Sequence, residues 1–299
     1  MRFTQGLFNI YLMKVYIIGD TGLFGVNLVK FLKKKKINLI LNSQNKFYNN
    51  VDFTQKKNVI KLLDKVKPDI IINLAALTNV DICEKNKIKA KRLNFGIPNN
   101  IKQWMNNNPN TFLIHLSTDQ LYSGQGPHNE LSVNVINNYS KTKLLGEECL
   151  VDTNTIILRT NFFGVSFSKR KSFTDWIYYS VKKNFFLYLF KNIKFSPLSI
   201  NSLCKYLFIV MKKKIPGIYN LGSKRGVSKS KFAILFLKEL NIKKFNHKIV
   251  NFKQNFAAKR SLDMRMNVNK FEKSFNIKLP TCSSEIRKEA KIYKMLYKK

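Results

Sequence analysis

The chain has 299 residues, of which 44% are hydrophobic and 13% aromatic, so it can bury the core of a globular protein. Its 54 Lys and Arg outnumber 17 Asp and Glu and give a net charge of +37. Because these cations are spread along the whole sequence, we expect a solvated basic surface and no nucleic-acid partner. No apolar stretch reaches the ~18 residues of a membrane span, so no membrane partner is expected.

Four cysteines stand singly in the sequence, at Cys83, Cys149, Cys204 and Cys282. A zinc site or a redox motif would need paired spacing, so we predict no metal site. Unpaired thiols are typical of a reducing compartment, and we expect the protein to be cytoplasmic.

The order of the predicted elements indicates an α/β protein. Residues 1–12 are predicted to be an N-terminal extension, because a strand and turn typical of a nucleotide-binding fold begin at Met13. Short β-branched runs then alternate with amphipathic stretches, and the predicted strands are 14–18, 37–41, 70–75, 111–117 and 155–160. This alternation predicts a Rossmann-type, doubly wound parallel sheet, with residues 13–160 as the NAD(P)-binding domain.

Beyond Thr160 the alternation is less regular and aromatic residues increase, as in "DWIYYSVKKNFFLYLF". We interpret residues 161–299 mainly as a smaller C-terminal α/β lobe that covers the sheet and binds substrate. The aromatic runs are assigned to the core of this lobe, because buried aromatic residues are commoner than exposed binding platforms.

The first predicted strand leads directly into "GDTGLFG", which places Gly19, Gly22 and Gly25 three residues apart. Glycines let a strand turn sharply into a helix whose free N–H groups can face a pyrophosphate. The spacing therefore predicts a dinucleotide site, with cofactor contacts at Gly19, Thr21, Gly22, Leu23, Phe24 and Gly25.

The second predicted strand bears on the choice of cofactor. NAD sites usually carry a carboxylate about 20 residues after the glycines, where it binds the ribose 2′-OH. No Asp or Glu occurs between Asp20 and Asp52, and the strand ends instead in "NSQNK", residues 42–46. Polar and basic groups can accept a 2′-phosphate, so the pattern favours NADP(H) over NAD(H). Asp52 and Phe53 are placed at the adenine, although Asp52 equally suits a helix start.

Later segments place small or polar residues where a cofactor and a substrate could meet. Ala75 and Ala76 would let a ribose approach the backbone, and "STD" brings Thr118 to a strand end. On a helix, Tyr139 and Lys143 share one face, which can look onto the strand ends. A neighbouring ammonium lowers the pKa of a phenol from about 10, and a hydroxyl can hydrogen-bond the same carbonyl. We therefore predict the catalytic set Thr118, Tyr139 and Lys143.

Together these motifs resemble the extended short-chain dehydrogenase/reductase superfamily, and within it the dTDP-4-dehydrorhamnose reductase-like enzymes of sugar nucleotides. The likeness runs from Met13 to about Arg287 and is carried by "IIGDTGLFG", "NLAALTNVD", "STDQLY", "NNYSKTKLLGEE" and "AAKRSLDMRMN". It implies NAD(P)H-dependent reduction of the 4-keto group of a nucleotide-activated deoxysugar, as in dTDP-rhamnose synthesis. Tyr139 would donate the proton, and Lys143 would also bind the nicotinamide ribose.

The resemblance implies further contacts as well. It assigns to the cofactor Leu74, Ala75, Ala76 and Asn94, beside Tyr139 and Lys143. It assigns to the sugar nucleotide Thr78, Val80, Thr118, Asp119, Phe162 and Arg260. Gln120 stands where related dehydratases carry a second acid, which favours simple reduction.

The sequence departs from this family at two positions. Phe162 replaces a Trp that meets the sugar ring, so an indole N–H is lost and the identity of the sugar stays open. Asp20 replaces a small residue beside the pyrophosphate, which its carboxylate would repel unless the side chain points away.

One rival function is left open by the resemblance. The methionine adenosyltransferase regulatory subunit is similar in fold and binds NADP without reducing a sugar. The joint presence of Thr118, Tyr139 and Lys143 argues against this alternative without excluding it. The residues do not decide the oligomeric state, and a homodimer is one option.

Overall fold

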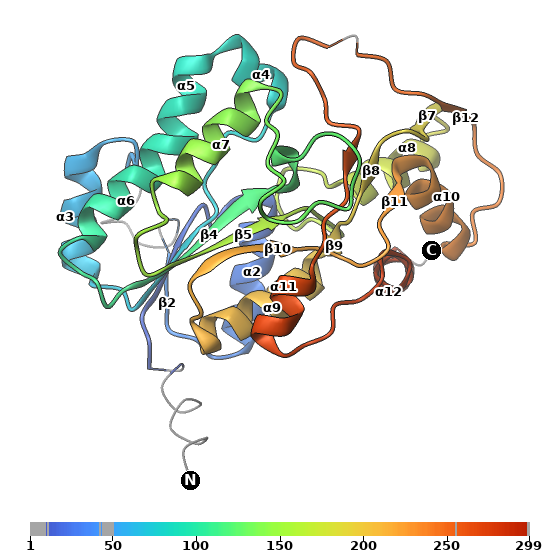
Figure 1. Ribbon diagram of the computed structural model, residues 1–299. Coiled ribbons are helices and arrows are strands. Elements are labelled where there is room, and N and C mark those ends of the chain that lie inside the picture. Colours follow the sequence, from blue (N-terminus) through green and yellow to red (C-terminus); the bar gives the residue numbers. More distant parts are fainter. Residues whose placement is uncertain (1–9, 11, 42, 44–50, 255, 298–299) are drawn as a thin grey trace.

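The computed structural model describes residues 10, 12–41, 43, 51–254 and 256–297 (Figure 1). Among these residues, six strands form a central sheet in the order β10-β5-β4-β3-β1-β2, and all neighbouring strands are parallel. The strands are β1 Val15–Ile18, β2 Leu39–Leu41, β3 Ile70–Asn73, β4 Phe112–Thr118, β5 Thr155–Thr160 and β10 Gly217–Leu221. All five predicted strands are present, each within about two residues of its predicted ends.

Helices cover both faces of this sheet, because successive strand side chains point to opposite faces and both sets are apolar. Val15 and Ile17 contact a core built with α2, α9 and α11, whereas Tyr16 and Ile18 contact a core built with α3 and α6. These helices are α2 Leu23–Lys34, α3 Lys56–Val66, α6 Ile97–Met105, α9 Ile200–Lys213 and α11 Asn269–Phe275. The predicted doubly wound α/β class is confirmed.

The carboxyl ends of the strands continue into short elements that shape the site. After β3 come α4 Val80–Lys85, α5 Lys87–Lys91 and a π-helical turn, Arg92–Gly96, which runs into α6. The side chains of Asn79 and Asn86 cap the first two of these helices by accepting hydrogen bonds from their first-turn N–H groups. A 3₁₀ turn, Asp119–Leu121, follows β4, and α7, Asn138–Glu148, lies beside α6.

The smaller C-terminal lobe contains helices and short strand pairs. Its helices are α8 Phe173–Lys182, α10 Lys229–Glu239 and α12 Cys282–Leu296. Its strands are β6 Phe162–Phe163, β7 Leu187–Phe190, β8 Lys194–Phe195, β9 Leu198–Ser199, β11 Val227–Ser228, β12 His247–Val250 and β13 Asp263–Met264. They pair as β11-β8-β13, β12-β7 and β6-β9 within the described part of the chain.

The aromatic run in this lobe is only partly core. Tyr178 is buried, but Phe185, Phe186 and Tyr188 are more than half exposed. The prediction that such runs are core is therefore wrong for Phe185 and Phe186, which precede β7, and for Tyr188 on its solvent-facing side, whereas Leu187 of the same strand is buried.

Part of the second half of the chain completes the main sheet. β10 pairs with β5 in parallel, and α9 packs against α2, although both segments fall within 161–299, the range interpreted mainly as the smaller lobe. Of the predicted extension 1–12, the structure describes Ile10 and Leu12, and Ile10 is buried against the core. Residues 1–9 and 11 lie outside the described ranges.

No helix in the described residues is long and apolar enough to cross a membrane. All four cysteines fall within the described ranges and are free thiols.

Candidate active site

A glycine turn joins β1 to α2 and forms one wall of the site. Gly19 has a φ of +86°, a conformation that favours glycine. A Cβ on Gly25 would lie 2.2 Å from the carbonyl oxygen of Gly19, so the helix can approach the turn only without a side chain there. The resulting cradle holds α2 with its free N–H groups at the strand end, which suits a pyrophosphate. The residues present therefore fit the dinucleotide that the sequence predicts.

A cavity of about 430 Å³ opens beside this turn. It is bounded by the glycine turn, the carboxyl ends of β3, β4 and β5, and one face of α7. Its lining includes most of the predicted site residues: Gly19, Gly22, Leu23, Phe24, Gly25, Leu74, Ala76, Thr78, Val80, Thr118, Asp119, Tyr139, Lys143 and Phe162. The structure thus brings together residues that are more than 140 positions apart in the sequence.

The end of β4 presents a row of buried polar groups. Thr118 Oγ1 accepts a hydrogen bond from the Gln120 N–H at 3.1 Å, and Asp119 accepts one from Asn161 Nδ2 at 2.7 Å. Burial raises the pKa of Asp119 to about 7, while the Asn161 hydrogen bond opposes the rise. Ser117 Oγ and Thr160 Oγ1 are buried in the cavity wall without a hydrogen-bond partner among the described residues. Such buried hydroxyls are available to a ligand.

Tyr139 lies in the first turn of α7, which begins with a capping box formed by Asn137 and Ser140. Burial raises its pKa well above the usual value, and a hydrogen bond with Thr118 opposes this. The ammonium of Lys143 is directed to other partners and does not lower that pKa. The predicted lowering of the Tyr139 pKa by Lys143 is therefore wrong for this geometry, and the phenol is neutral across the physiological range.

Lys143 is only 2% exposed and lies one helical turn beyond Tyr139. Its Nζ donates to the carbonyl oxygen of Leu116 at 2.8 Å and lies 3.3 Å from His115 Nε2. Burial lowers the pKa of Lys143 to about 8, and the nearby Glu147 carboxylate opposes the shift. Burial, and then the Lys143 charge, hold the pKa of His115 well below its usual value, so the imidazole is neutral.

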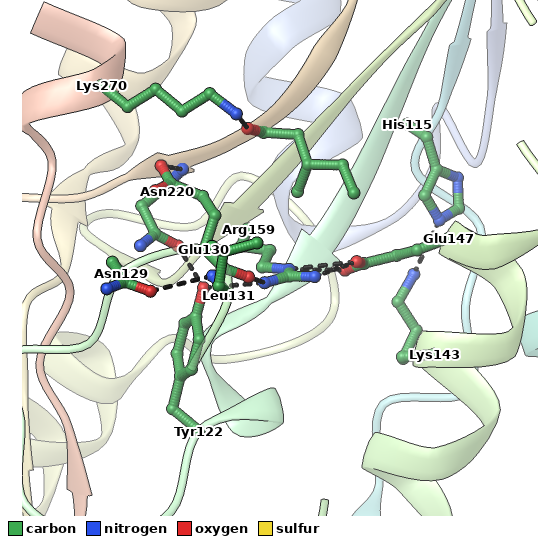
Figure 2. A network of polar contacts seen from close by, with 11 residues as sticks. His115, Tyr122, Asn129, Glu130, Leu131, Lys143, Glu147, Arg159, Asn220 and Lys270 are labelled. Atoms are coloured by element: carbon green, nitrogen blue, oxygen red, sulfur yellow. Dashed lines mark hydrogen bonds and ion pairs between the residues drawn. The ribbon is translucent and has the colours of Figure 1, made fainter. Parts of the chain in front are cut away.

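A buried polar network ties α7 to the sheet, and Figure 2 shows it. The Arg159 guanidinium donates to both oxygens of Glu147, the shortest contact being 2.6 Å, and also to the hydroxyl of Tyr122 at 3.0 Å. Tyr122 in turn donates to Asn220 of β10 at 2.6 Å. Both charged side chains of the pair are at most 3% exposed. The network fixes the position of α7 relative to the ends of the strands, and Tyr139 and Lys143 are positioned with the helix.

Comparison with known proteins places the chain in a family. The sequence profile of the RmlD substrate binding domain family matches residues 13–295. The chain belongs to this family. The dTDP-4-dehydrorhamnose reductase of Shigella flexneri is 26% identical over 285 residues, which cover 90% of this chain and 94% of the relative. A probable low-salt glycan biosynthesis reductase of Haloferax volcanii is 26% identical over 234 residues, 74% of this chain and 78% of the relative.

Solved structures of similar proteins share the fold. A dTDP-4-dehydrorhamnose reductase from Clostridium acetobutylicum has a TM-score of 0.85 at 23% identity, covering 95% of this chain and 100% of that chain. One from Bacillus anthracis, solved in complex with NADP, has a TM-score of 0.84 at 21% identity, covering 93% of this chain and 98% of that chain. The predicted family and Rossmann-type fold are confirmed.

A further sequence relative bears on the rival function. The beta subunit of bovine methionine adenosyltransferase 2 is 26% identical over 158 residues, which cover 51% of this chain and 47% of the relative.

In this member of the RmlD substrate binding domain family, three residues predicted to bind the cofactor do not line the cavity. Phe53 is buried in the core beside Tyr16, and Asp52 is exposed and accepts hydrogen bonds from Thr54. Asn94 is fully buried and exchanges hydrogen bonds with the backbone of Leu77, so it holds the loop after β3.

The remaining predicted residues lie at the margins of the cavity. Thr21 is exposed in the glycine turn, and the Ala75 N–H donates to Asn73 beneath the turn. Arg260 pairs with Asp81 at the start of α4. Of segment 42–46, predicted to accept a 2′-phosphate, only Ser43 is within the described residues.

Sequence reasoning missed several residues of this RmlD-family cavity. They are Leu116, Ser117, Thr160, Asn161, Arg170 and Lys171. The polar residues at the ends of β4 and β5 could have been found by their position, since binding groups collect at the carboxyl ends of parallel strands. Arg170 and Lys171 gave no signal, because cations occur throughout this sequence.

Proposed function

We propose that this protein reduces the 4-keto group of a nucleotide-activated deoxysugar with a reduced nicotinamide dinucleotide. The name of its relatives, dTDP-4-dehydrorhamnose reductase, describes a reaction of this kind. The observation that carries the proposal is the meeting of Thr118, Tyr139 and Lys143 at one cavity beside the glycine turn. The combination of a buried phenol, a buried ammonium and a turn that can hold a pyrophosphate, all at one cavity, suits hydride transfer to a carbonyl.

The residues at the cavity divide the reaction between them. A bound reduced dinucleotide supplies the hydride for the carbonyl carbon. Tyr139 donates its proton to the carbonyl oxygen, which suits a phenol whose raised pKa keeps it protonated before the reaction. The Thr118 hydroxyl hydrogen-bonds the same oxygen and polarises it. The ammonium of Lys143, one helical turn away, can donate a hydrogen bond to the ribose of the bound dinucleotide and so position it for the reaction. The ketone becomes an alcohol, and the Tyr139 phenolate regains a proton from solvent before the next turnover.

The substrate occupies the side of the cavity towards the smaller lobe. Thr78 and Val80 also line the cavity, and Phe162 offers a flat apolar surface that packs on Phe24, with ring centroids 5.3 Å apart. Arg170 and Lys171 also line the cavity, so they can meet the diphosphate of a nucleotide sugar. The basic surface would raise the association rate of such an anion. A cytoplasmic location and a homodimer stay predictions.

The proposal covers NADP(H) and NAD(H) as alternatives. The sequence favoured NADP(H), because no acid follows β2. The contacts of Asp20 bear against that preference, since they place a carboxylate at the end of β2.

The direct test mixes the protein and NADPH or NADH with a panel of 4-keto sugar nucleotides, dTDP-4-dehydrorhamnose first, and follows loss of the reduced-nicotinamide absorbance. We expect multiple turnovers with a 4-keto sugar nucleotide. Cofactor binding without turnover on any of them would instead favour the regulatory-subunit alternative, and binding of neither cofactor would contradict both.

The activity should depend on the charge of Lys143. Because the pKa of Lys143 is about 8, its ammonium is present below that pH and lost above it. We therefore expect kcat/KM for the sugar nucleotide to fall as the pH rises through about 8. A pH profile measured at fixed ionic strength checks this. The Lys143→Met variant should show low activity without that step, and an unchanged step in this variant would assign it to another group.

A further inference from the structure

The carboxylate of Asp20 lies at the end of β2 although its residue belongs to the glycine turn. Its Oδ2 accepts two hydrogen bonds from Ser43, one from the backbone N–H at 3.2 Å and one from the hydroxyl at 2.5 Å. Ser43 follows β2 closely, and Ile17 of β1 is in register with Leu41 of β2. The side chain of Asp20 is therefore turned sideways, towards the neighbouring strand.

This position has a general meaning in a doubly wound sheet. A dinucleotide whose pyrophosphate lies on the glycine turn extends its adenosine ribose over the end of the second strand. Proteins that bind NAD commonly place a carboxylate there, about 20 residues after the glycines, to accept hydrogen bonds from the ribose hydroxyls. In this chain the strand end supplies Ser43, and the carboxylate comes from Asp20 across the gap between the strands.

The charge at this place is uncompensated in the described structure. Asp20 is only 6% exposed, and no Lys or Arg of the described residues forms an ion pair with it. Its second oxygen, Oδ1, has no hydrogen-bond partner among those residues either. An acceptor oxygen that makes no hydrogen bond to the described residues suits a ribose hydroxyl. A 2′-phosphate would bring a second negative charge to a poorly solvated carboxylate.

We propose that Asp20 sets the cofactor preference of the enzyme: its carboxylate accepts a hydrogen bond from the adenosine ribose 2′-OH, so NADH is preferred over NADPH. This inference rests on the proposed function, because it needs a dinucleotide on the glycine turn. It reverses the preference derived from the sequence, where the missing acid after β2 favoured NADP(H). A carboxylate is present at the end of β2, but it is contributed by Asp20, which precedes β2 in the chain.

The test measures Kd for NADH and for NADPH on the full chain, by quenching of protein fluorescence or by calorimetry, at one ionic strength. For the wild type we expect NADH to bind about tenfold more tightly, the size expected from one charged hydrogen bond against a like-charge contact. In Asp20→Asn, which keeps the shape and removes the charge, we expect NADPH to bind at least as tightly as NADH.

Two further variants keep the test specific. Asp152→Asn makes the same change of net charge at an exposed site before β5, and it should keep the wild-type ratio of the two constants. Ser43→Ala removes the hydroxyl but leaves the carboxylate, so it too should keep a preference for NADH. Melting curves show whether each variant folds, and the wild-type ratio decides the matter if Asp20→Asn does not.

Two outcomes would overturn the inference alone. One is tighter binding of NADPH than NADH by the wild type; the other is an unchanged ratio in folded Asp20→Asn. Binding of neither cofactor would overturn the proposed function, and the inference with it. Turnover of a keto sugar with either cofactor leaves the function standing, so the two failures are distinguishable.

Discussion

Replacing Tyr139 with Phe is expected to lower kcat for the keto sugar about a thousandfold, within the range lost when a general acid is removed. The phenol is the proton donor in the proposed reaction, and its ring is 6% exposed, so Phe keeps the packing and loses only the hydroxyl. Cofactor Kd should change less than threefold, because the glycine cradle is untouched. Steady-state kinetics and a fluorescence titration on the same preparation measure both quantities.

The matched control is Tyr188→Phe, which removes a hydroxyl from an exposed tyrosine of β7 that does not line the cavity. This variant should retain wild-type kcat. Wild-type turnover by Tyr139→Phe would remove Tyr139 from the mechanism. A parallel loss of cofactor binding would show that the hydroxyl holds the cofactor and does not serve chemistry alone.

Replacing Arg159 with Leu is expected to lower the free energy of unfolding by about 3–5 kcal/mol, the usual result of leaving one partner of a buried ion pair alone. The substitution strands the Glu147 carboxylate, which is 1% exposed, and also removes hydrogen bonds to Tyr122 and to the Glu130 carbonyl oxygen. Urea unfolding monitored by circular dichroism measures the loss.

The exposed pair Arg287–Glu239 provides the control for this prediction. Arg287→Leu should change the free energy of unfolding by less than about 1 kcal/mol, since exposed pairs contribute little. The double variant Arg159→Leu, Glu147→Leu should be more stable than Arg159→Leu alone, because no charge is then left buried. Equal losses from Arg159→Leu and Arg287→Leu would contradict the role given to the buried network.

Local patterns were enough to predict five of the six strands of the central sheet and the centre of the cavity. The β-branched runs gave all five strands, because parallel strands buried on both faces are continuously apolar. The spacing of Gly19, Gly22 and Gly25 predicted the turn, and the close approach at Gly25 shows why no other residue fits. The four-residue spacing of Tyr139 and Lys143 put both on the cavity side of α7.

Contacts between distant segments could not be predicted in the same way. The Gly217–Leu221 segment, GIYNL, carries a single β-branched residue, and only its pairing with β5 makes it the sixth strand of the sheet. The charge of Lys143 was expected to act on Tyr139, but its ammonium lies against Leu116 and His115, which a helix periodicity cannot show. Asp20 is a further example. A search for an acidic residue in and after β2 overlooks Asp20, which lies in the turn after β1 and contacts Ser43 in space.

The proposed reaction requires hydride delivery to a sugar carbonyl above the glycine turn. The measurement that tests it most directly uses reduced cofactor carrying deuterium at the transferable position, with dTDP-4-dehydrorhamnose as substrate, and locates the label by nuclear magnetic resonance. We predict a single deuterium on C4 of the product sugar with wild-type protein and none above background with Tyr139→Phe. Oxidation of the cofactor with no label on any sugar carbon, or a label at another carbon, would contradict the proposed reaction.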